Sequence, residues 1–256
     1  MPVITLTTDF GSSDAYVGVM KGVILSIAPQ AVLVDLCHHV PAQDVRAAAV
    51  VLYQAASFFP TDVVHLAVVD PGVGSGRQAL AVRTAWGTFV APDNGLLSLV
   101  LASTELREAV VLTNADYWLP SVRATFHGRD IFAPVAAHLA NGVPLSCLGD
   151  PAFDLVPLSM PQPDFGSPTV TVAHVLHVDH FGNLILDIKA HQIPPRPVFE
   201  IAGQAPCQLC RTYADGAPGQ LIAYVGSTHN HVEMAARNGN AAEMTGAGIG
   251  APVLIR

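Results

Sequence analysis

The sequence predicts an α/β domain followed by a smaller, mainly β domain, and three observations lead to this prediction. Short β-branched stretches alternate with amphipathic stretches from residue 3 to about residue 155. A segment rich in proline and glycine follows at 157–171, and it is typical of a linker. Beyond it lie only short strand-like stretches separated by turn residues. Alternation of the first kind indicates helices that cover a largely parallel sheet.

Each element of the first domain has its own signal. Strand-forming stretches occupy 3–9, 31–38, 63–74, 79–95 and 109–114. Helical spacing of apolar residues appears at 14–29, 41–60 and 96–104, and a further helix opens at TFHGRDIFAP (125–134). Prolines end the first of these helices and flank the second.

The second domain reads as a small barrel or sandwich. Its strands are expected at 171–179, 183–188, 197–203, 221–226 and 252–256. The domains are therefore placed at 1–160 and 171–256, with a linker at 161–170.

Composition limits the classes of function. A chain of 256 residues that is 51% hydrophobic can bury a large core, and only 12% charged residues makes an obligate oligomer plausible. Lys and Arg total 12 against 20 Asp and Glu, so the chain has the wrong sign of charge for binding nucleic acid. No apolar run is long enough to span a bilayer, and the start of the chain lacks the pattern of a signal peptide, so we expect a cytoplasmic protein. The four cysteines are expected to be reduced core residues.

Polar clusters follow several strands of the first domain. They are TTDFGSSD, DPGVGSGR and APDNG, and TFHGRDIFAP follows further along. Ligands of open α/β sheets collect at the carboxyl ends of strands, although each cluster alone is also ordinary turn chemistry. The clusters together therefore predict a site at this edge of the sheet.

Phosphate and metal sites are disfavoured. The glycines of VVDPGVGSGRQ (68–78) lack the Gly-Lys-Ser/Thr ending of a phosphate loop, and a strand rather than a helix follows them. His174, His177 and His180 lie on an extended segment, where side chains alternate between faces, so they do not converge on a metal. No G-x-S-x-G elbow of a serine hydrolase is present.

Six motifs in order resemble one family across nearly the whole chain. TTDFGSSDAYVGVMKGVI, DLCHHVPAQDV, VVDPGVGSGR, APDNGLL, TFHGRDIFAP and DHFGNLILDI are similar to those of the S-adenosylmethionine (SAM) hydrolases, also called SAM hydroxide adenosyltransferases, relatives of the fluorinating and chlorinating enzymes. The resemblance implies a Rossmann-like α/β domain, a C-terminal β-barrel and a homotrimer with active sites between subunits. It implies hydrolysis of S-adenosyl-L-methionine to adenosine and methionine with no metal or cofactor.

The resemblance also implies roles for individual residues. A catalytic triad of the family matches Asp70, Arg77 and His127. Substrate-binding positions match Asp9 at the ribose hydroxyls, Asp14 near the methionine ammonium, Asn183 at the adenine edge, Asp179 and Ser227 on the rest of the ligand, and Phe10, Asn94 and Phe181. The match is looser at 227–238, where His229 stands in place of a glycine and one residue is inserted before Glu233.

These residues suit attack of water on a sulfonium. Arg77 stays protonated, so it stabilises hydroxide and lowers the pKa of His127, while His127 or Asp70 accepts the proton, with His127 the favoured acceptor. Two alternatives remain open. A halogenase of the same fold has no use for a carboxylate and a base beside the nucleophile, and a non-catalytic nucleoside-binding protein would leave the triad incidental.

Overall fold

The computed structural model describes residues 1–256 and divides into two compact units, 1–158 and 159–256. The N-terminal unit contains β1 (Val3–Thr8), α1 (Tyr16–Ile27), β2 (Val32–Cys37), α2 (Val45–Ala56), β3 (Val64–Val68), β4 (Ala79–Thr84), β5 (Gly87–Pro92), α3 (Ser98–Leu101), β6 (Leu106–Leu112), α4 (Ala133–Ala140) and β7 (Gly149–Pro151). A single π-helical turn, η2 (Gly128–Phe132), leads directly into α4.

The N-terminal sheet has the order β2-β1-β3-β5-β4-β6-β7. The pairs β1–β2, β1–β3 and β3–β5 are parallel, whereas β4–β5, β4–β6 and β6–β7 are antiparallel. The α/β class is thus confirmed, but the sheet is mixed rather than largely parallel, and a Rossmann-like arrangement is not confirmed. The cause lies between β4 and β5, where two residues leave room for a hairpin turn but for no crossover helix.

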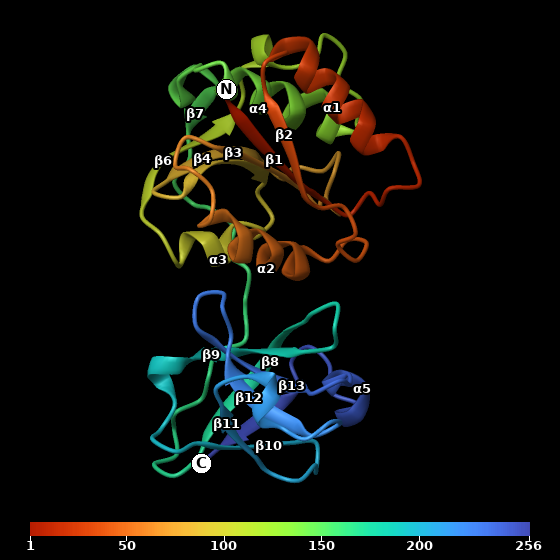
Figure 1. Ribbon diagram of the computed structural model, residues 1–256. Helices are drawn as coiled ribbons and strands as arrows, with labels where there is room; N and C mark the ends of the chain where they lie inside the picture. The colour runs from red at the N-terminus through yellow and green to blue at the C-terminus, as the bar shows by residue number, and fades with distance from the viewer. The chain divides into compact units, whose positions relative to one another are not determined.

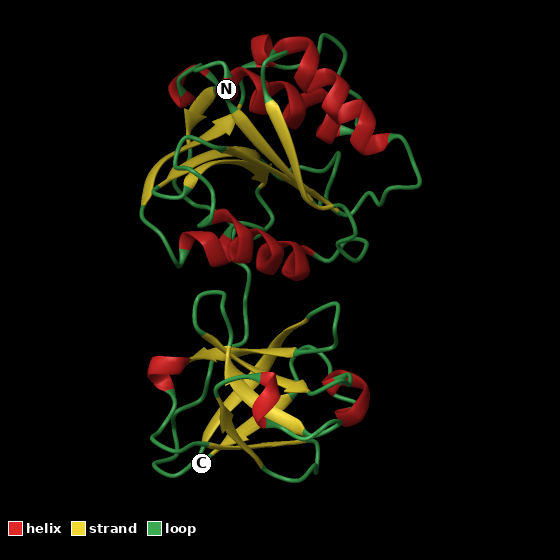
Figure 2. Ribbon diagram, viewed as in Figure 1, coloured by secondary structure: helices red, strands yellow, loops and turns green.

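Helices cover both faces of this sheet (Figures 1 and 2). One core cluster joins Ile4 and Leu6 of β1 to Met20 of α1 and Val135 of α4. A second cluster joins α2 and α3 to the opposite face, where Ala67 is buried. Successive side chains of a strand point to opposite faces, so an almost continuous apolar strand such as β3 serves both layers.

Two helices differ from the sequence prediction. Helix α2 begins only at Val45, because Asp44 caps it by accepting the N–H of Ala47 at 2.9 Å and Gln43 before it has a positive φ of 66°. Helix α3 is a single turn, shorter than the predicted 96–104.

The C-terminal unit is a closed seven-stranded barrel, which confirms the barrel expectation. Its strands are β8 (Thr171–Val178), β9 (Leu184–Lys189), β10 (Val198–Ile201), β11 (Cys207–Cys210), β12 (Leu221–Val225), β13 (His231–Ala236) and β14 (Pro252–Ile255), with the short helix α5 (Ala241–Thr245). They close in the order β10-β11-β12-β13-β9-β8-β14 around an apolar interior, which includes Phe199 and Met234. The strands predicted from sequence did not include β11 or β13.

Two remaining expectations concern the cysteines and the membrane. All four cysteines are free thiols, but Cys147 is exposed, so the expectation that all four lie in the core is wrong. None of the helices has the length and apolar character needed to cross a bilayer.

Candidate active site

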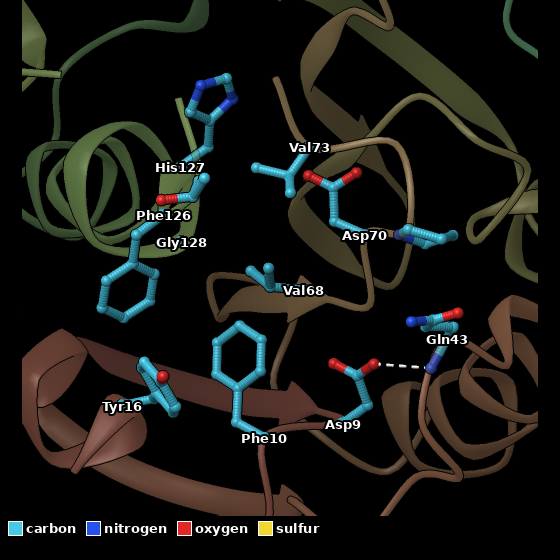
Figure 3. Close-up of a pocket in the computed structure, with 12 residues that line it drawn as sticks. Asp9, Phe10, Tyr16, Gln43, Val68, Asp70, Val73, Phe126, His127 and Gly128 are labelled. Atoms are coloured by element: carbon cyan, nitrogen blue, oxygen red, sulfur yellow. Dashed lines mark hydrogen bonds between the residues drawn. The ribbon is translucent and has the colours of Figure 1, made fainter. Parts of the chain in front are cut away.

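A cavity of about 390 Å³ opens where β1 and β3 end in the N-terminal unit (Figure 3). We call it the N-terminal cavity. It is lined by Asp9, Phe10, Tyr16, Gln43, Val68, Asp70, Pro71, Val73, Thr125, Phe126, His127 and Gly128. The polar clusters after β1 and β3 and the TFHGRDIFAP motif therefore meet in one place, as the sequence predicts.

Asp70, Arg77 and His127 form one hydrogen-bonded group at this cavity. Arg77 Nε lies 2.9 Å from Asp70 Oδ1 and 3.0 Å from Oδ2, and Arg77 Nη2 also donates to Oδ2. The same Nη2 lies 2.9 Å from His127 Nδ1. The side chains of Asp70 and Arg77 are only 6% and 10% exposed, so solvent screens this ion pair weakly.

The direction of these bonds fixes the state of His127. A guanidinium only donates, so Nδ1 of His127 accepts and the neutral ring carries its proton on Nε2. Burial, followed by the positive charge of Arg77, lowers the pKa of His127 below its usual value and outweighs the carboxylates Asp70 and Asp130. His127 is therefore a neutral imidazole with one N–H to offer a ligand.

One glycine explains why the loop between Asp70 and Arg77 closes on His127. Gly74 has a φ of 78°, and a Cβ there would lie 2.6 Å from the backbone oxygen of Ala124. The loop thus packs against the segment just before His127 only because residue 74 has no side chain. Gly76 faces open space and carries no such constraint.

A buried ion pair supports the backbone that carries His127. Asp130, fully buried in the π-helical turn, receives Arg129 Nε at 2.5 Å and the N–H of Arg123 at 2.8 Å. Both bonds hold the pKa of Asp130 below its usual value, although burial acts in the opposite direction as the largest single influence. The widened turn, a frequent device at functional sites, places His127 and Gly128 on the cavity wall.

Asp9 is held by a strained neighbour. One oxygen of its carboxylate accepts the backbone N–H of Gln43 at 2.8 Å, as Figure 3 shows. Gln43 has a φ of 66°, a left-handed conformation that costs a residue with a side chain free energy. This conformation directs the backbone N–H of Gln43 at Asp9 and places the Gln43 side chain on the cavity wall.

Three aromatic rings form the opposite wall. Phe10, Tyr16 and Phe126 lie with ring centroids 5.3 to 6.0 Å apart in tilted and edge-on arrangements. Their apolar surface gives this side of the cavity a low local dielectric, which strengthens the charges facing it.

Three predicted residues of the N-terminal unit lie outside the lining, and Arg77 is connected to it through its bonds to Asp70 and His127. Asp14 is exposed in the loop before α1. Asn94 donates to the backbone oxygen of Val69 at 2.9 Å and accepts from the N–H of Leu96 at 3.2 Å, so it braces the end of β3 beside Asp70.

The other predicted residues lie in the C-terminal unit, two of them at a second cavity. This C-terminal cavity of about 560 Å³ is lined by Phe181, Asn183, Thr212, Tyr213, Ala214, Ala236, Arg237, Asn238 and Gly239. Asp179 lies beneath the turn that carries Phe181 and Asn183 and accepts the N–H of both residues, at 2.9 and 2.8 Å. Ser227 is exposed in the hairpin loop between β12 and β13, outside both linings.

The sequence reasoning missed several lining residues. The prediction did not single out four of them, which are Gln43, Tyr16, Tyr213 and Arg237. Among these four, only the aromatic side chains gave a weak signal in the sequence. No group of three or more His, Cys, Asp or Glu side chains is placed to hold a metal ion.

Comparison with known proteins identifies the family. Residues 4–149 match the SAM hydroxide adenosyltransferase N-terminal domain and residues 173–254 match the C-terminal domain. A protein of Salinispora tropica named (R)-S-adenosyl-L-methionine hydrolase is 44% identical over 96% of this chain and 94% of its own length. A fluorinase of Nocardia brasiliensis is more distant, with 27% identity over 88% of this chain and 87% of its own length.

A solved structure shows the same architecture. The crystal structure of an uncharacterized conserved protein from Thermotoga maritima superposes with a TM-score of 0.92 and 34% identity, covering 98% of this chain and 99% of that one. Both domains of one family thus match in order and account for most of the chain. The chain belongs to the SAM hydroxide adenosyltransferase family.

Proposed function

We propose that this protein hydrolyses S-adenosyl-L-methionine to adenosine and L-methionine, with no metal or cofactor. The observation that carries the proposal is the Asp70–Arg77–His127 group at the N-terminal cavity, which Asp9 also lines. The Salinispora relative is named for the (R) epimer at sulfur, and we propose the same epimer as substrate here.

The reaction needs one nucleophile in line behind a good leaving group. Water attacks C5′ of the ribose, the C5′–S bond breaks, and its electron pair stays on sulfur, which leaves as the neutral thioether of methionine. The water loses one proton, so the products are adenosine, methionine and H⁺. The protein's task is to position the water and to accept that proton.

Asp70 is the better placed proton acceptor. His127 Nδ1 already accepts from Arg77, and its Nε2 already carries a proton. A carboxylate has about four acceptor positions. The single Nε–H of Arg77 is shared between Oδ1 and Oδ2 of Asp70, and Nη2 donates to Oδ2, so Oδ1 keeps an open acceptor position. We therefore favour Asp70 over His127 as the proton acceptor, which is the reverse of the expectation from sequence. We propose that His127 Nε2–H orients the water oxygen.

Electrostatics favour the step in this setting. Hydroxide and sulfonium lose charge as they approach each other, so a site with few water molecules penalises the separated ions more than the transition state. Arg77 stabilises the developing hydroxide, while Asp9 and Asp14 suit a cationic ligand with ribose hydroxyls.

The adenosine end of the ligand is assigned to the C-terminal unit. Asn183 and Phe181 line its cavity and suit the adenine ring, and Asp179 and Ser227 are assigned to the rest of the ligand, as the resemblance implies. We further propose a homotrimer with active sites between subunits, which light scattering on the purified protein tests by mass.

Product analysis tests the function directly. Purified protein incubated with each sulfonium epimer of S-adenosylmethionine is expected to yield adenosine and methionine, faster from the (R) epimer. Formation of 5′-chloroadenosine in chloride buffer would establish a halogenase instead, and binding without turnover would establish a nucleoside-binding protein. Unchanged activity in the presence of a chelator is expected of an enzyme without a metal.

A further inference from the structure

Five polar side chains form a continuous chain of hydrogen bonds across one side of the barrel. Asn183 Nδ2 donates to Asp179 Oδ2 at 2.8 Å and to Tyr213 Oη at 3.2 Å. Tyr213 Oη lies 2.5 Å from Tyr224 Oη, and Tyr224 Oη donates to a carboxylate oxygen of Glu233. The chain joins the turn after β8 to strands β12 and β13.

The two carboxylates at its ends fix the direction of every bond. An ionised carboxylate only accepts, so Tyr224 donates to Glu233, and its oxygen must then accept the proton of Tyr213. The oxygen of Tyr213 in turn accepts from Asn183, whose second N–H is committed to Asp179. Both amide hydrogens of Asn183 are thus used within the protein.

The amide oxygen of Asn183 is the polar atom that remains for a ligand. Asn183 is 5% exposed and lines the C-terminal cavity, together with the rings of Phe181 and Tyr213. A flat heteroaromatic ring fits between such walls, and a fixed carbonyl oxygen on the wall selects a ring that carries an N–H donor.

The side chain of Glu233 packs against the backbone of Gly226 in the barrel. A Cβ on Gly226 would lie 1.9 Å from Glu233 Oε1, so the carboxylate occupies space that only a glycine leaves free. Burial raises the pKa of this carboxyl, and the nearby Asp179 adds to the shift. Tyr224 is 8% exposed, and burial together with Glu233 raises the pKa of its hydroxyl as well. Glu233 is half-buried on the face of β13 that it shares with Ala235, opposite the face whose Met234 joins the barrel interior. A partly desolvated carboxylate is costly, which argues that it has a task.

We propose that Glu233, acting through Tyr224 and Tyr213, fixes the orientation of the Asn183 amide and thereby makes the C-terminal cavity select 6-amino over 6-oxo purines. The proposal rests on the proposed function, in which this cavity holds the adenine ring. Glu233, Tyr224 and Tyr213 are positioning residues, because they act through Asn183.

The selectivity follows from which groups would face each other. An adenine amino group donates to Asn183 Oδ1, whereas a 6-oxo group would place two acceptors face to face. Turning the amide over would present its oxygen to Asp179 Oδ2 and remove the donor to Tyr213, so the site resists the change. An unpaired buried acceptor corresponds to about 10- to 100-fold in affinity.

Nucleoside binding to the full-length protein tests the proposal. Isothermal titration with adenosine, purine riboside and inosine is expected to rank them in that order, with inosine about 10- to 100-fold weaker than adenosine. Tyr224→Phe breaks the chain at its centre and is expected to shrink the adenosine-to-inosine ratio several-fold. Equal affinity of the wild-type protein for adenosine and inosine would overturn the proposal.

Two further variants separate positioning from folding. Glu233→Gln keeps an acceptor for Tyr224 and is expected to retain most of the preference, whereas Glu233→Leu is expected to lose it. Tyr53→Phe removes a buried tyrosine hydroxyl from α2 of the N-terminal unit and serves as the control with an unchanged ratio. Because the readout is a ratio of affinities, a uniform loss of folded protein does not move it, and an unchanged ratio in both Tyr224→Phe and Glu233→Leu would contradict the proposal.

Failure of this inference is distinguishable from failure of the proposed function. Hydrolysis of S-adenosylmethionine without any preference for adenosine over inosine would remove the inference alone. A clear preference that depends on Tyr224, in a protein without hydrolase activity, would remove the enzyme assignment and leave the inference standing.

Discussion

Arg77 Nη2 donates to Nδ1 of His127 across 2.9 Å, and this one contact determines the chemistry open to the histidine. The guanidinium has no lone pair to offer, so the imidazole is an acceptor on that side and a donor on the other. A histidine in this state orients a water molecule by donating Nε2–H to its oxygen. We therefore propose that Asp70, the remaining group of the triad with an open acceptor position, takes the proton that the water loses.

Replacing His127 distinguishes orientation from base catalysis. A glutamine can present its amide oxygen to Arg77 and an N–H to the water, but it does not accept a proton at neutral pH. We expect His127→Ala to lower kcat about 100- to 1,000-fold, as for loss of one oriented donor, and His127→Gln to recover at least a tenfold part of that. If steady-state kinetics show glutamine to be as inactive as alanine, His127 is the base.

Replacing Asp70 by the isosteric asparagine removes the proposed proton acceptor. We expect Asp70→Asn to lower kcat about 100- to 10,000-fold, the usual range for loss of a general base, with little change in KM. Arg77 then lacks its anionic partner, so circular dichroism should accompany the kinetics to show that the fold persists. Asp62→Asn makes the same change at an exposed carboxylate before β3 and outside the cavity lining, so it is the matched control and should retain full activity.

The pH dependence of kcat should show an acid limb from His127. Burial and Arg77 lower its pKa, so the ring is neutral at pH 7 and remains so below the ordinary value of about 6.5. Because the pKa of His127 is lower in the folded protein than in the unfolded chain, the neutral ring contributes to folding stability at pH values above the unfolded pKa. This contribution is lost as the pH falls through the folded pKa. Protonation then places an N–H against Arg77. A pH–rate profile is expected to remain flat through pH 6.5 and to fall only at the lower pH where the ring takes up a proton, and His127→Gln should lack this limb.

Gly74 should be far less tolerant of substitution than Gly76. Gly74→Ala meets both a left-handed φ and the Ala124 carbonyl, so we expect a lower melting temperature and a displaced Arg77 with reduced kcat. Gly76→Ala lies two residues away in the same loop and meets open space. Equal melting temperatures for the two variants would show that the close contact at Ala124 does not hold the loop in place.

The pairing of Asp70 with Arg77 was predictable because it is local. A strand that ends in a carboxylate, followed by a glycine-rich turn and a new strand, returns the chain to the same sheet edge within seven residues. The fold class was predictable for a related reason, since periodicity reports burial along one element at a time. The mixed sheet was not expected, although the hairpin between β4 and β5 is too short for a parallel crossover.

Contacts that depend on register between distant strands could not be predicted. Asn183, Tyr213 and Glu233 lie on three segments, and nothing in the local sequence shows that their side chains meet. The positive φ of Gln43 is equally invisible, because glutamine gives no sign of a left-handed backbone. Both features arise from tertiary packing, which the order of residues along one element does not encode.

Gln43 offers a test of whether strain is retained for function. Gln43→Gly relieves a left-handed backbone conformation that costs about 1–2 kcal/mol. Glycine also adds conformational entropy to the unfolded chain, which costs about 0.5–1 kcal/mol. Calorimetry should therefore show a gain of up to about 1 kcal/mol in the free energy of unfolding. The same change removes a side chain from the cavity wall beside Asp9, so KM should rise. Ala202→Gly, at a φ of 48° in an exposed turn of the barrel, is the matched control and should stabilise the protein without altering KM. A stabilised Gln43→Gly protein with unchanged kinetics would show that the strained residue serves only the path of the backbone into α2.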